Sequence, residues 1–119
     1  MEGGLYLRWG KPVRGFEREA LALYAEAMEY WNNKLEAGVI TWFEPFFFET
    51  ADFEEEAGFW VIKGPEEKIV PLWHEPQFLT VNSKAAIYLQ HYTVRMLRVG
   101  DALPEFIEHL GKVYAEIGV

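Results

Sequence analysis

The chain has 119 residues, half of them hydrophobic and 17% aromatic, which is enough apolar material for the core of one domain, and we expect residues 1–119 to form that single domain. Its formal net charge is −8 and its 11 lysines and arginines form no run, which excludes nucleic-acid binding and argues against binding to an anionic membrane surface. The chain has no cysteine, which excludes disulfides, thiol nucleophiles and cysteine-based metal sites and fits the cytoplasmic location that we expect.

Two elements open the chain, a strand over residues 5–9 and a helix over residues 16–37. The side chains of the strand alternate between two faces, and the strand ends at Gly10. One face carries Leu5, Leu7 and Trp9, and the other carries Tyr6 and Arg8. In the helix, apolar residues recur every three or four positions and form one stripe, and Gly38 is placed to end it in the left-handed conformation.

Residues 39–49 and 58–63 indicate two further strands. Pro45 cannot donate a hydrogen bond to a neighbouring strand, so the first of them must lie at an edge of the sheet or carry a bulge. Alternation places Trp42 and Glu44 on the same face of that strand. The second strand is apolar throughout, which predicts a central position. An apolar edge strand requires protection against random pairing, and a second subunit would provide it.

A broken helix follows these strands. Pro71 and Pro76 interrupt the region, which predicts a short helical turn, a bend around His74 and Glu75, and a second helix over residues 77–86.

The last part of the chain predicts a strand over residues 91–99 and a final helix. The strand carries Tyr92, Val94 and Met96 on one face, and His91, Thr93 and Arg95 on the other. Gly100 ends it, and Asp101 is expected to be the N-cap of the helix. The apolar stripe of this helix comprises Leu103, Phe106, Ile107, Leu110 and Tyr114.

The resulting order is strand, helix, strand, strand, broken helix, strand, helix. Its core is a ferredoxin-like β-α-β-β-α-β unit of the α+β class with an extra C-terminal helix. The alternation predicts helices on one face of the sheet only. The other face needs a cover, and we expect a homodimer to provide it.

Three segments are similar to short bacterial proteins without a characterised function: LRWGKPV at 7–13, GFWVIKGPEE at 58–67, and residues 86–100. Together with the order of elements, they resemble the dimeric α/β-barrel superfamily, in which two ferredoxin-like subunits bring their open sheet faces together around a central barrel. The resemblance therefore implies a dimeric α/β barrel. That superfamily includes cofactor-free monooxygenases, haem-degrading oxygenases, lyases, isomerases and proteins without known activity, and the fold does not choose among them.

The first candidate site is the open face of the sheet. The expected ligand-binding residues are Tyr6, Arg8, Trp42, Glu44, Trp60, Thr93 and Arg95, with His91 beside them. Arginines, a histidine and a tyrosine around an aromatic-lined cavity could bind a small carboxylate or a phenolic compound. The alternative is structural, with ion pairs between strands or subunits, for instance between Arg8 or Arg95 and Glu44.

The second candidate is His74. In the haem-degrading members a histidine of this helical region binds the iron and a tryptophan of the preceding strand lies near the haem, and His74 and Trp60 occupy similar places. The asparagine that those enzymes carry on the first strand is absent, since Tyr6 and Arg8 stand there. Because histidine titrates near neutrality, His74 or His91 could also be the general base of a cofactor-free enzyme. The alternative is that His74 is a surface residue.

The sequence therefore favours a small-molecule-binding or structural homodimeric barrel. One alternative is a cofactor-free monooxygenase or isomerase that acts on an aromatic or polyketide-like compound, with His74 and His91 as catalytic residues. Another is a haem-binding or haem-degrading protein. We expect no metal, no cofactor, no nucleic-acid partner and no membrane span, because no apolar stretch approaches ~20 residues.

Overall fold

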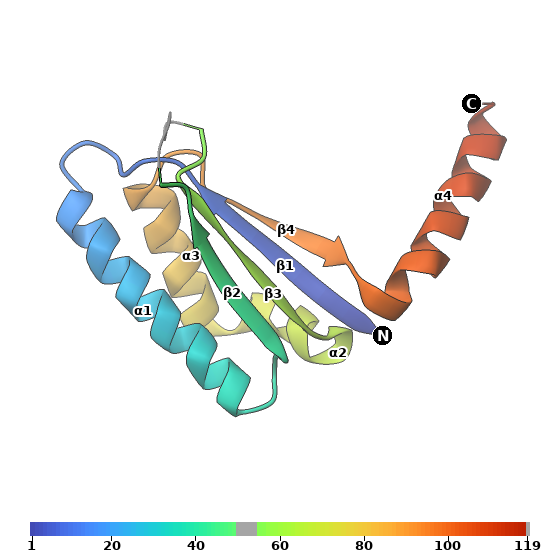
Figure 1. The fold of residues 1–119 in the computed structure, drawn as a ribbon, viewed down its shortest axis with the longest axis horizontal. Coiled ribbons are helices and arrows are strands. Elements are labelled where there is room, and N and C mark those ends of the chain that lie inside the picture. Colours follow the sequence, from blue (N-terminus) through green and yellow to red (C-terminus); the bar gives the residue numbers. More distant parts are fainter. Residues whose placement is uncertain (50–54, 119) are drawn as a thin grey trace.

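The structure is a computed structural model that describes residues 1–49 and 55–118 (Figure 1). Within these ranges one sheet is built from β1 (Glu2–Trp9), β2 (Trp42–Phe47), β3 (Gly58–Pro65) and β4 (Thr93–Arg98). The helices are α1 (Glu17–Glu36), α2 (Glu66–Ile69), α3 (Pro76–Tyr88) and α4 (Leu103–Ile117), with 3₁₀ turns η1 (Val70–His74) and η2 (Gly100–Ala102).

The strand order in the sheet is β2-β3-β1-β4, and every neighbouring pair is antiparallel. One crossover, through α1, joins β1 to β2, and the other, through α2, η1 and α3, joins β3 to β4. This is the ferredoxin-like β-α-β-β-α-β arrangement, so the predicted fold with its extra C-terminal helix is confirmed. As Pro45 predicted, β2 lies at an edge, and the apolar β3 is central.

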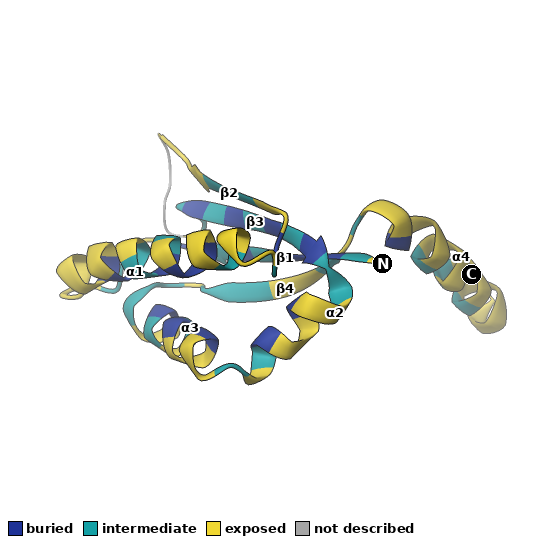
Figure 2. Ribbon diagram, turned by 90° about the horizontal axis from the view of Figure 1, so that it is seen from below, coloured by how far each residue is buried: buried dark blue, intermediate teal, exposed yellow. Residues whose placement is uncertain are grey.

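One face of the sheet is covered by helices. The register pairs Leu5 with Ile62 and Leu7 with Trp60, so these side chains share a face, and burial alternates along β3 as this pairing requires (Figure 2). The buried apolar residues of α1 and α3 belong to the same core cluster as these strand residues. Within the described ranges the structure therefore has two layers, and the helices leave the second face of the sheet uncovered.

Two of the strands differ in length from their prediction. β1 begins at Glu2 rather than at residue 5, because Gly3 and Gly4 allow a close approach: a Cβ atom on Gly4 would lie 2.9 Å from the carbonyl oxygen of Ile62. β2 is shorter than the predicted range 39–49, and Ile40, buried just before it, closes the core instead.

Two predictions for the C-terminal third are wrong. His91 does not belong to β4, because it lies in a turn before the strand with a φ of 56°, in the left-handed region. Asp101 is not the N-cap of α4, because it lies in η2 and its Oδ1 accepts a hydrogen bond from the backbone N–H of Glu2 at 2.7 Å.

The bend predicted around His74 and Glu75 is held by a polar contact. The hydroxyl of Tyr30 donates to Oε1 of Glu75 at 2.8 Å, and Nζ of Lys34 donates to Oε2 at 2.7 Å. Burial alone would raise the pKa of Glu75, but the hydrogen bonds from Lys34 and Tyr30 outweigh it and lower that pKa. Glu75 thus ties the start of α3 to the last turns of α1.

None of the described helices is both long and apolar enough to cross a membrane.

Candidate functional site

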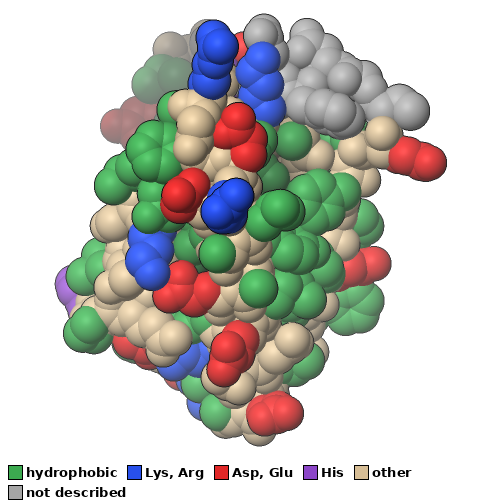
Figure 3. Space-filling model, turned by 90° about the vertical axis from the view of Figure 1, so that its left-hand side faces the viewer, with side chains coloured by type: hydrophobic (Ala, Val, Ile, Leu, Met, Phe, Trp, Pro, Cys, Tyr) green, Lys and Arg blue, Asp and Glu red, His purple; other side chains and the backbone are tan. Residues whose placement is uncertain are grey.

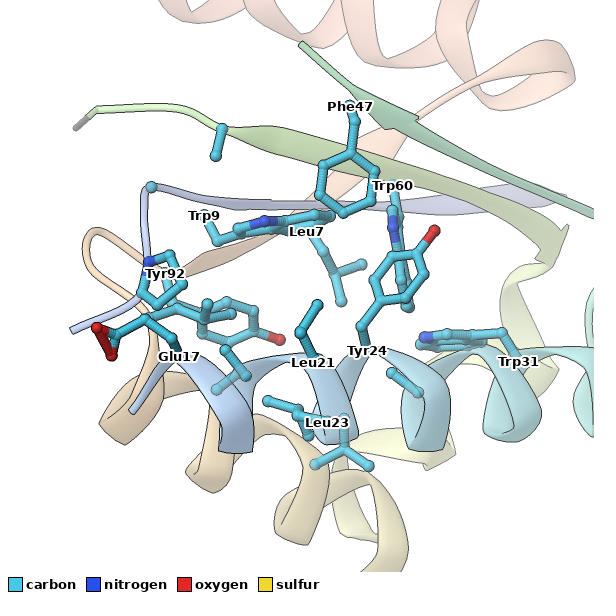
Figure 4. Close-up of a pocket in the computed structure, with 18 residues that line it drawn as sticks. Leu7, Trp9, Glu17, Leu21, Leu23, Tyr24, Trp31, Phe47, Trp60 and Tyr92 are labelled. Carbon is cyan, nitrogen blue, oxygen red and sulfur yellow. The ribbon is translucent and has the colours of Figure 1, made fainter. Parts of the chain in front are cut away.

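A cavity of about 340 Å³ lies between α1, α3 and the helix-covered face of the sheet. Figure 4 shows that Leu21, Leu23 and Tyr24 rise into it from α1, while Trp9 and Trp60 enter from the sheet. Its lining is almost wholly apolar, and its volume falls in the range of small-molecule sites. The sequence did not predict this cavity, because it arises from the spacing of side chains that come from several elements.

Aromatic rings from separate elements contact one another around the cavity. The ring centroids of Trp9 and Trp60 lie 5.6 Å apart at an interplanar angle of 87°, and those of Tyr24 and Trp60 lie 5.3 Å apart at 68°. Tyr24 also meets Phe47 of β2, at 5.0 Å. The edge-on contacts of Trp60 and the tilted contact between Tyr24 and Phe47 hold the rings in fixed orientations, so the wall of the cavity is pre-formed.

Two hydrogen-bond donors at this cavity lack an acceptor. The indole N–H groups of Trp31 and Trp60 are buried, and neither has a hydrogen-bond partner among the described residues. A buried donor left without a partner costs roughly 1–3 kcal/mol. Such unpaired groups are rare in native proteins, and an acceptor on a bound compound is one physical explanation for them.

The lining also contains the hydroxyls of Tyr24 and Tyr92 and the carboxylate of Glu17. Burial raises the pKa of the Tyr24 hydroxyl, so this phenol is neutral at physiological pH. Burial also raises the pKa of Tyr92, whose hydroxyl donates to Oδ1 of Asn82. Glu17, the one charged residue of the described lining, is exposed, and its carboxylate accepts a hydrogen bond from the backbone N–H of Gly15 at 2.7 Å.

Apolar side chains of this region also reach the surface. Leu21 and Phe47 both line the cavity and expose 75% and 58% of their area. Figure 3 shows hydrophobic side chains that reach the surface between charged ones on one side of the molecule. The cavity is therefore bordered by apolar groups that an apolar compound can contact on entry.

A second cluster, of polar residues, lies at one end of the open face. The Tyr6 hydroxyl donates to Oε1 of Glu56 at 2.7 Å, and Nη2 of Arg8 donates to the backbone oxygen of Glu55 at 3.0 Å. The Arg8 guanidinium lies within 4.0 Å of both carboxylates, and Nε2 of His91 lies 3.8 Å from Oε1 of Glu55. Burial, followed by the hydrogen bond to Glu56, raises the pKa of Tyr6.

The predicted open-face residues are only partly brought together. The register places Thr93 beside Arg8 and Arg95 beside Tyr6, so these four share the open face as predicted. Glu44 lies on the same face, opposite Val61 of β3. No ion pair joins Glu44 to Arg8 or Arg95 among the described residues. Arg8 pairs instead with Glu55 and Glu56, which the sequence indicated only as part of an acidic loop.

The predicted positions of Trp42, Trp60 and His74 have different outcomes in the structure. Trp42 lies on the open face of β2, with Nζ of Lys63 4.8 Å from the centre of its ring. The placement of Trp60 on that face is wrong, because Trp60 pairs with Leu7 and is buried against the helices. His74 is exposed at the end of η1 and is not in the described lining of the cavity that Trp60 enters. The structure thus does not bring His74 and Trp60 together at this cavity.

No set of three or more histidine, aspartate or glutamate side chains in the described ranges is close enough together to hold a metal ion.

No protein-family model and no curated protein matches the chain. Solved structures do match. A dimeric ferredoxin-like protein of unknown function from Jannaschia sp. CCS1 is 11% identical with a TM-score of 0.61, and the match covers 82% of this chain and 99% of that one. A protein from Agrobacterium tumefaciens is 15% identical with a TM-score of 0.45, over 85% of this chain and 95% of that one. The first of these likenesses shows that the two proteins share the ferredoxin-like fold.

Proposed function

We propose that the chain is a small-molecule-binding protein whose ligand is a largely apolar, ring-containing compound that carries a hydrogen-bond acceptor. The observation that carries this proposal is the aromatic cavity with two buried and unpaired indole N–H groups, those of Trp31 and Trp60. A carbonyl or ether oxygen of a bound compound would satisfy at least one of them and remove the cost of a buried donor without a partner.

Binding is favoured over catalysis because the cavity offers no suitable base in the described residues. His74 and His91 both lie outside the described lining. Tyr24 keeps its proton because burial raises its pKa, and Glu17 is exposed. A cofactor-free oxygenase or isomerase needs a base within hydrogen-bond reach of the substrate. A haem protein of the expected type needs an iron ligand, and His74 does not enter this lining.

We also infer that the protein acts as a homodimer formed through the open face of the sheet. Trp42 and Phe46 on this face expose 46% and 37% of their area, and Trp42 lies on the edge strand. A second copy would cover these rings and protect the edge. The solved relative described above is itself dimeric, which supports this inference. Tyr6, Arg8, Thr93 and Arg95 would then order the interface rather than bind the ligand.

The acceptor preference can be tested with two probes of nearly equal shape, 1-acetylnaphthalene and 1-ethylnaphthalene. Only the first has a carbonyl acceptor. One neutral hydrogen bond contributes about 1 kcal/mol, so we expect the wild-type protein to bind the acetyl probe roughly fivefold more tightly. Quenching of tryptophan fluorescence, checked by calorimetry, measures both affinities.

The matched variants are Trp60→Phe and Trp31→Phe, which keep an aromatic ring and remove one N–H each. We expect at least one of them to abolish the preference for the acetyl probe, because the donor is lost while most of the apolar wall remains. Trp42→Phe, on the open face, is the control and should keep the preference. Equal affinities in the wild-type protein, or no binding of either probe, would overturn the proposal.

A further inference from the structure

Helix α4 has an apolar stripe that the described residues of its own chain leave uncovered. Apolar residues recur along it at steps of three and four, and none of its residues is buried. The most exposed members are Leu103, Ile107, Tyr114 and Ile117, at 41%, 58%, 49% and 65%. Figure 1 shows the helix running away from the sheet and from α1 and α3, and Figure 2 shows it at the far end of the molecule with no other helix beside it.

An isolated helix of this length is marginal in water. Helices shorter than ~12–15 residues are barely stable alone, because nucleation is costly and most helical stability comes from packing of an apolar face. α4 has 15 residues, and one of them is Gly111, in its interior. A regular helix here, with its stripe exposed, therefore indicates a packing partner.

The joint before α4 is held by contacts that direct the helix away from the body of its own subunit. Oδ1 of Asp101 accepts the hydrogen bond from the N–H of Glu2, and Ala102 is only 2% exposed. The guanidinium of Arg98 lies 5.2 Å from the centre of the Phe106 ring. These contacts tie the last residues of β4 and the first turn of α4 to the start of β1, and the helix leaves the body from there.

We propose that the apolar stripe of α4 packs on a second copy of this chain, beside its open sheet face, so that two subunits exchange their C-terminal helices. This inference rests on the homodimer proposed above and adds α4 as an element that holds the two subunits together. Reciprocal exchange is the isologous arrangement expected of a two-fold dimer. Two such stripes and the surfaces they cover would bury on the order of 1,600 Å², the size of a stable and specific interface.

The open face of the sheet offers apolar groups to such a stripe. Trp42 and Phe46 lie on this face and expose 46% and 37% of their area. Contact with α4 of the other copy would bury apolar area on both partners, which favours this occupant.

The first test uses the full-length chain in sedimentation equilibrium. We expect a wild-type dimer, and we expect Ile107→Lys to weaken its association on the order of tenfold or more, because a charge would be buried in the interface. Ala115→Lys adds the same charge to the polar side of the same helix and should leave the association unchanged. Circular dichroism and tryptophan emission are measured for each variant to check that its α/β core is folded.

The outcomes separate the two proposals. A monomeric wild-type protein would overturn both the homodimer and the helix exchange. A wild-type dimer that Ile107→Lys leaves intact, or that both variants weaken equally, would overturn the exchange alone. Binding of 1-acetylnaphthalene is measured separately, so its failure concerns the cavity and not α4.

A second test detects the contact directly and does not depend on a variant that perturbs the interface. The chain has no cysteine, so Ala115→Cys carries a single nitroxide label. This labelled protein is mixed with unlabelled, ¹⁵N-enriched protein. Exchange predicts that amide signals of the open-face strand residues Val61 and Leu97 broaden in the enriched copy, while those of the exposed side of α1 do not. No broadening in a confirmed dimer would overturn the proposal.

Discussion

Single residues show where reading the sequence succeeds and where it fails. Alternation placed Tyr6, Arg8, Thr93 and Arg95 on one face, and the register confirms it, because residues directly opposite one another in a sheet share a face. The predicted face of Trp60 is wrong, since residues 58–62 are all apolar and show no alternation of polar and apolar side chains. In such a strand, a shift of one residue reverses the face of every side chain.

Glu75 provides a residue-scale prediction for stability. Glu75→Gln keeps the shape of the side chain but loses the charged partner of Lys34, so we expect it to lower the free energy of unfolding by about 1 kcal/mol at pH 7. Because the folded-state pKa of Glu75 is lowered, its contribution is fully present above its ordinary pKa of about 4.3 and is lost as the pH falls through the folded-state value. Urea unfolding of both proteins from pH 7 to pH 3 measures the difference.

The pair between Lys84 and Glu26 is the control for this effect. Its nitrogen and oxygen lie 3.1 Å apart, but its side chains are 41% and 37% exposed, so solvent screens it. Lys84→Gln should therefore change the free energy of unfolding by less than about 0.5 kcal/mol. A difference for Glu75→Gln that stays constant down to pH 3 would contradict the assigned role of its charge.

At the scale of elements, the glycines explain why strands and helices lie where they do. Gly58 lies at the start of β3, and a Cβ atom there would lie 2.6 Å from the carbonyl oxygen of Phe46 and 2.8 Å from Cζ2 of Trp9. Gly111 lies in the interior of α4 with no atom within 4 Å of such a Cβ. Packing therefore requires glycine at position 58, whereas Gly111 only weakens α4.

These two positions predict opposite effects of the same substitution. Gly58→Ala should lower the free energy of unfolding by about 2 kcal/mol or more, because backbone and indole must move apart. Gly111→Ala should increase the helical signal at 222 nm and stabilise α4 by up to about 1 kcal/mol, because alanine loses less entropy in a helix. Thermal unfolding followed by circular dichroism checks both, and a destabilising Gly111→Ala would contradict the open position of that residue.

The elements themselves follow from sequence patterns to different degrees. The stripe of α4 was predicted from its three- and four-residue spacing, and the helix exists, but the pattern could not tell what covers it. The polarity of His91 fits the alternation and predicts that this residue belongs to β4. Its backbone is left-handed, however, so the strand begins only after it, at Thr93. Local periodicity reports the side that a residue faces, and not the position where pairing stops.

At the scale of the whole molecule, the order of elements was sufficient to predict the ferredoxin-like sheet, because short connections and alternating crossovers leave few arrangements. The cavity was not predictable in this way. Its walls come from β1, β2, β3, α1 and α3, and its volume depends on how Trp9, Tyr24 and Trp60 rest against one another. The same holds for Glu55 and Glu56, whose partners Tyr6 and Arg8 lie far away in sequence.

The central claim is that a compound with an acceptor occupies the aromatic cavity, and the indole N–H signals of the five tryptophans test it most directly. Each signal is assigned in ¹H–¹⁵N correlation spectra through a Trp→Phe variant, and 1-acetylnaphthalene is then titrated into the wild-type protein. We predict a downfield shift of the Trp60 or Trp31 signal, as expected when an N–H group gains a hydrogen bond, and little change at Trp42 and Trp73. Shifts confined to Trp42 and Trp73, or no shift at any indole, would contradict the account.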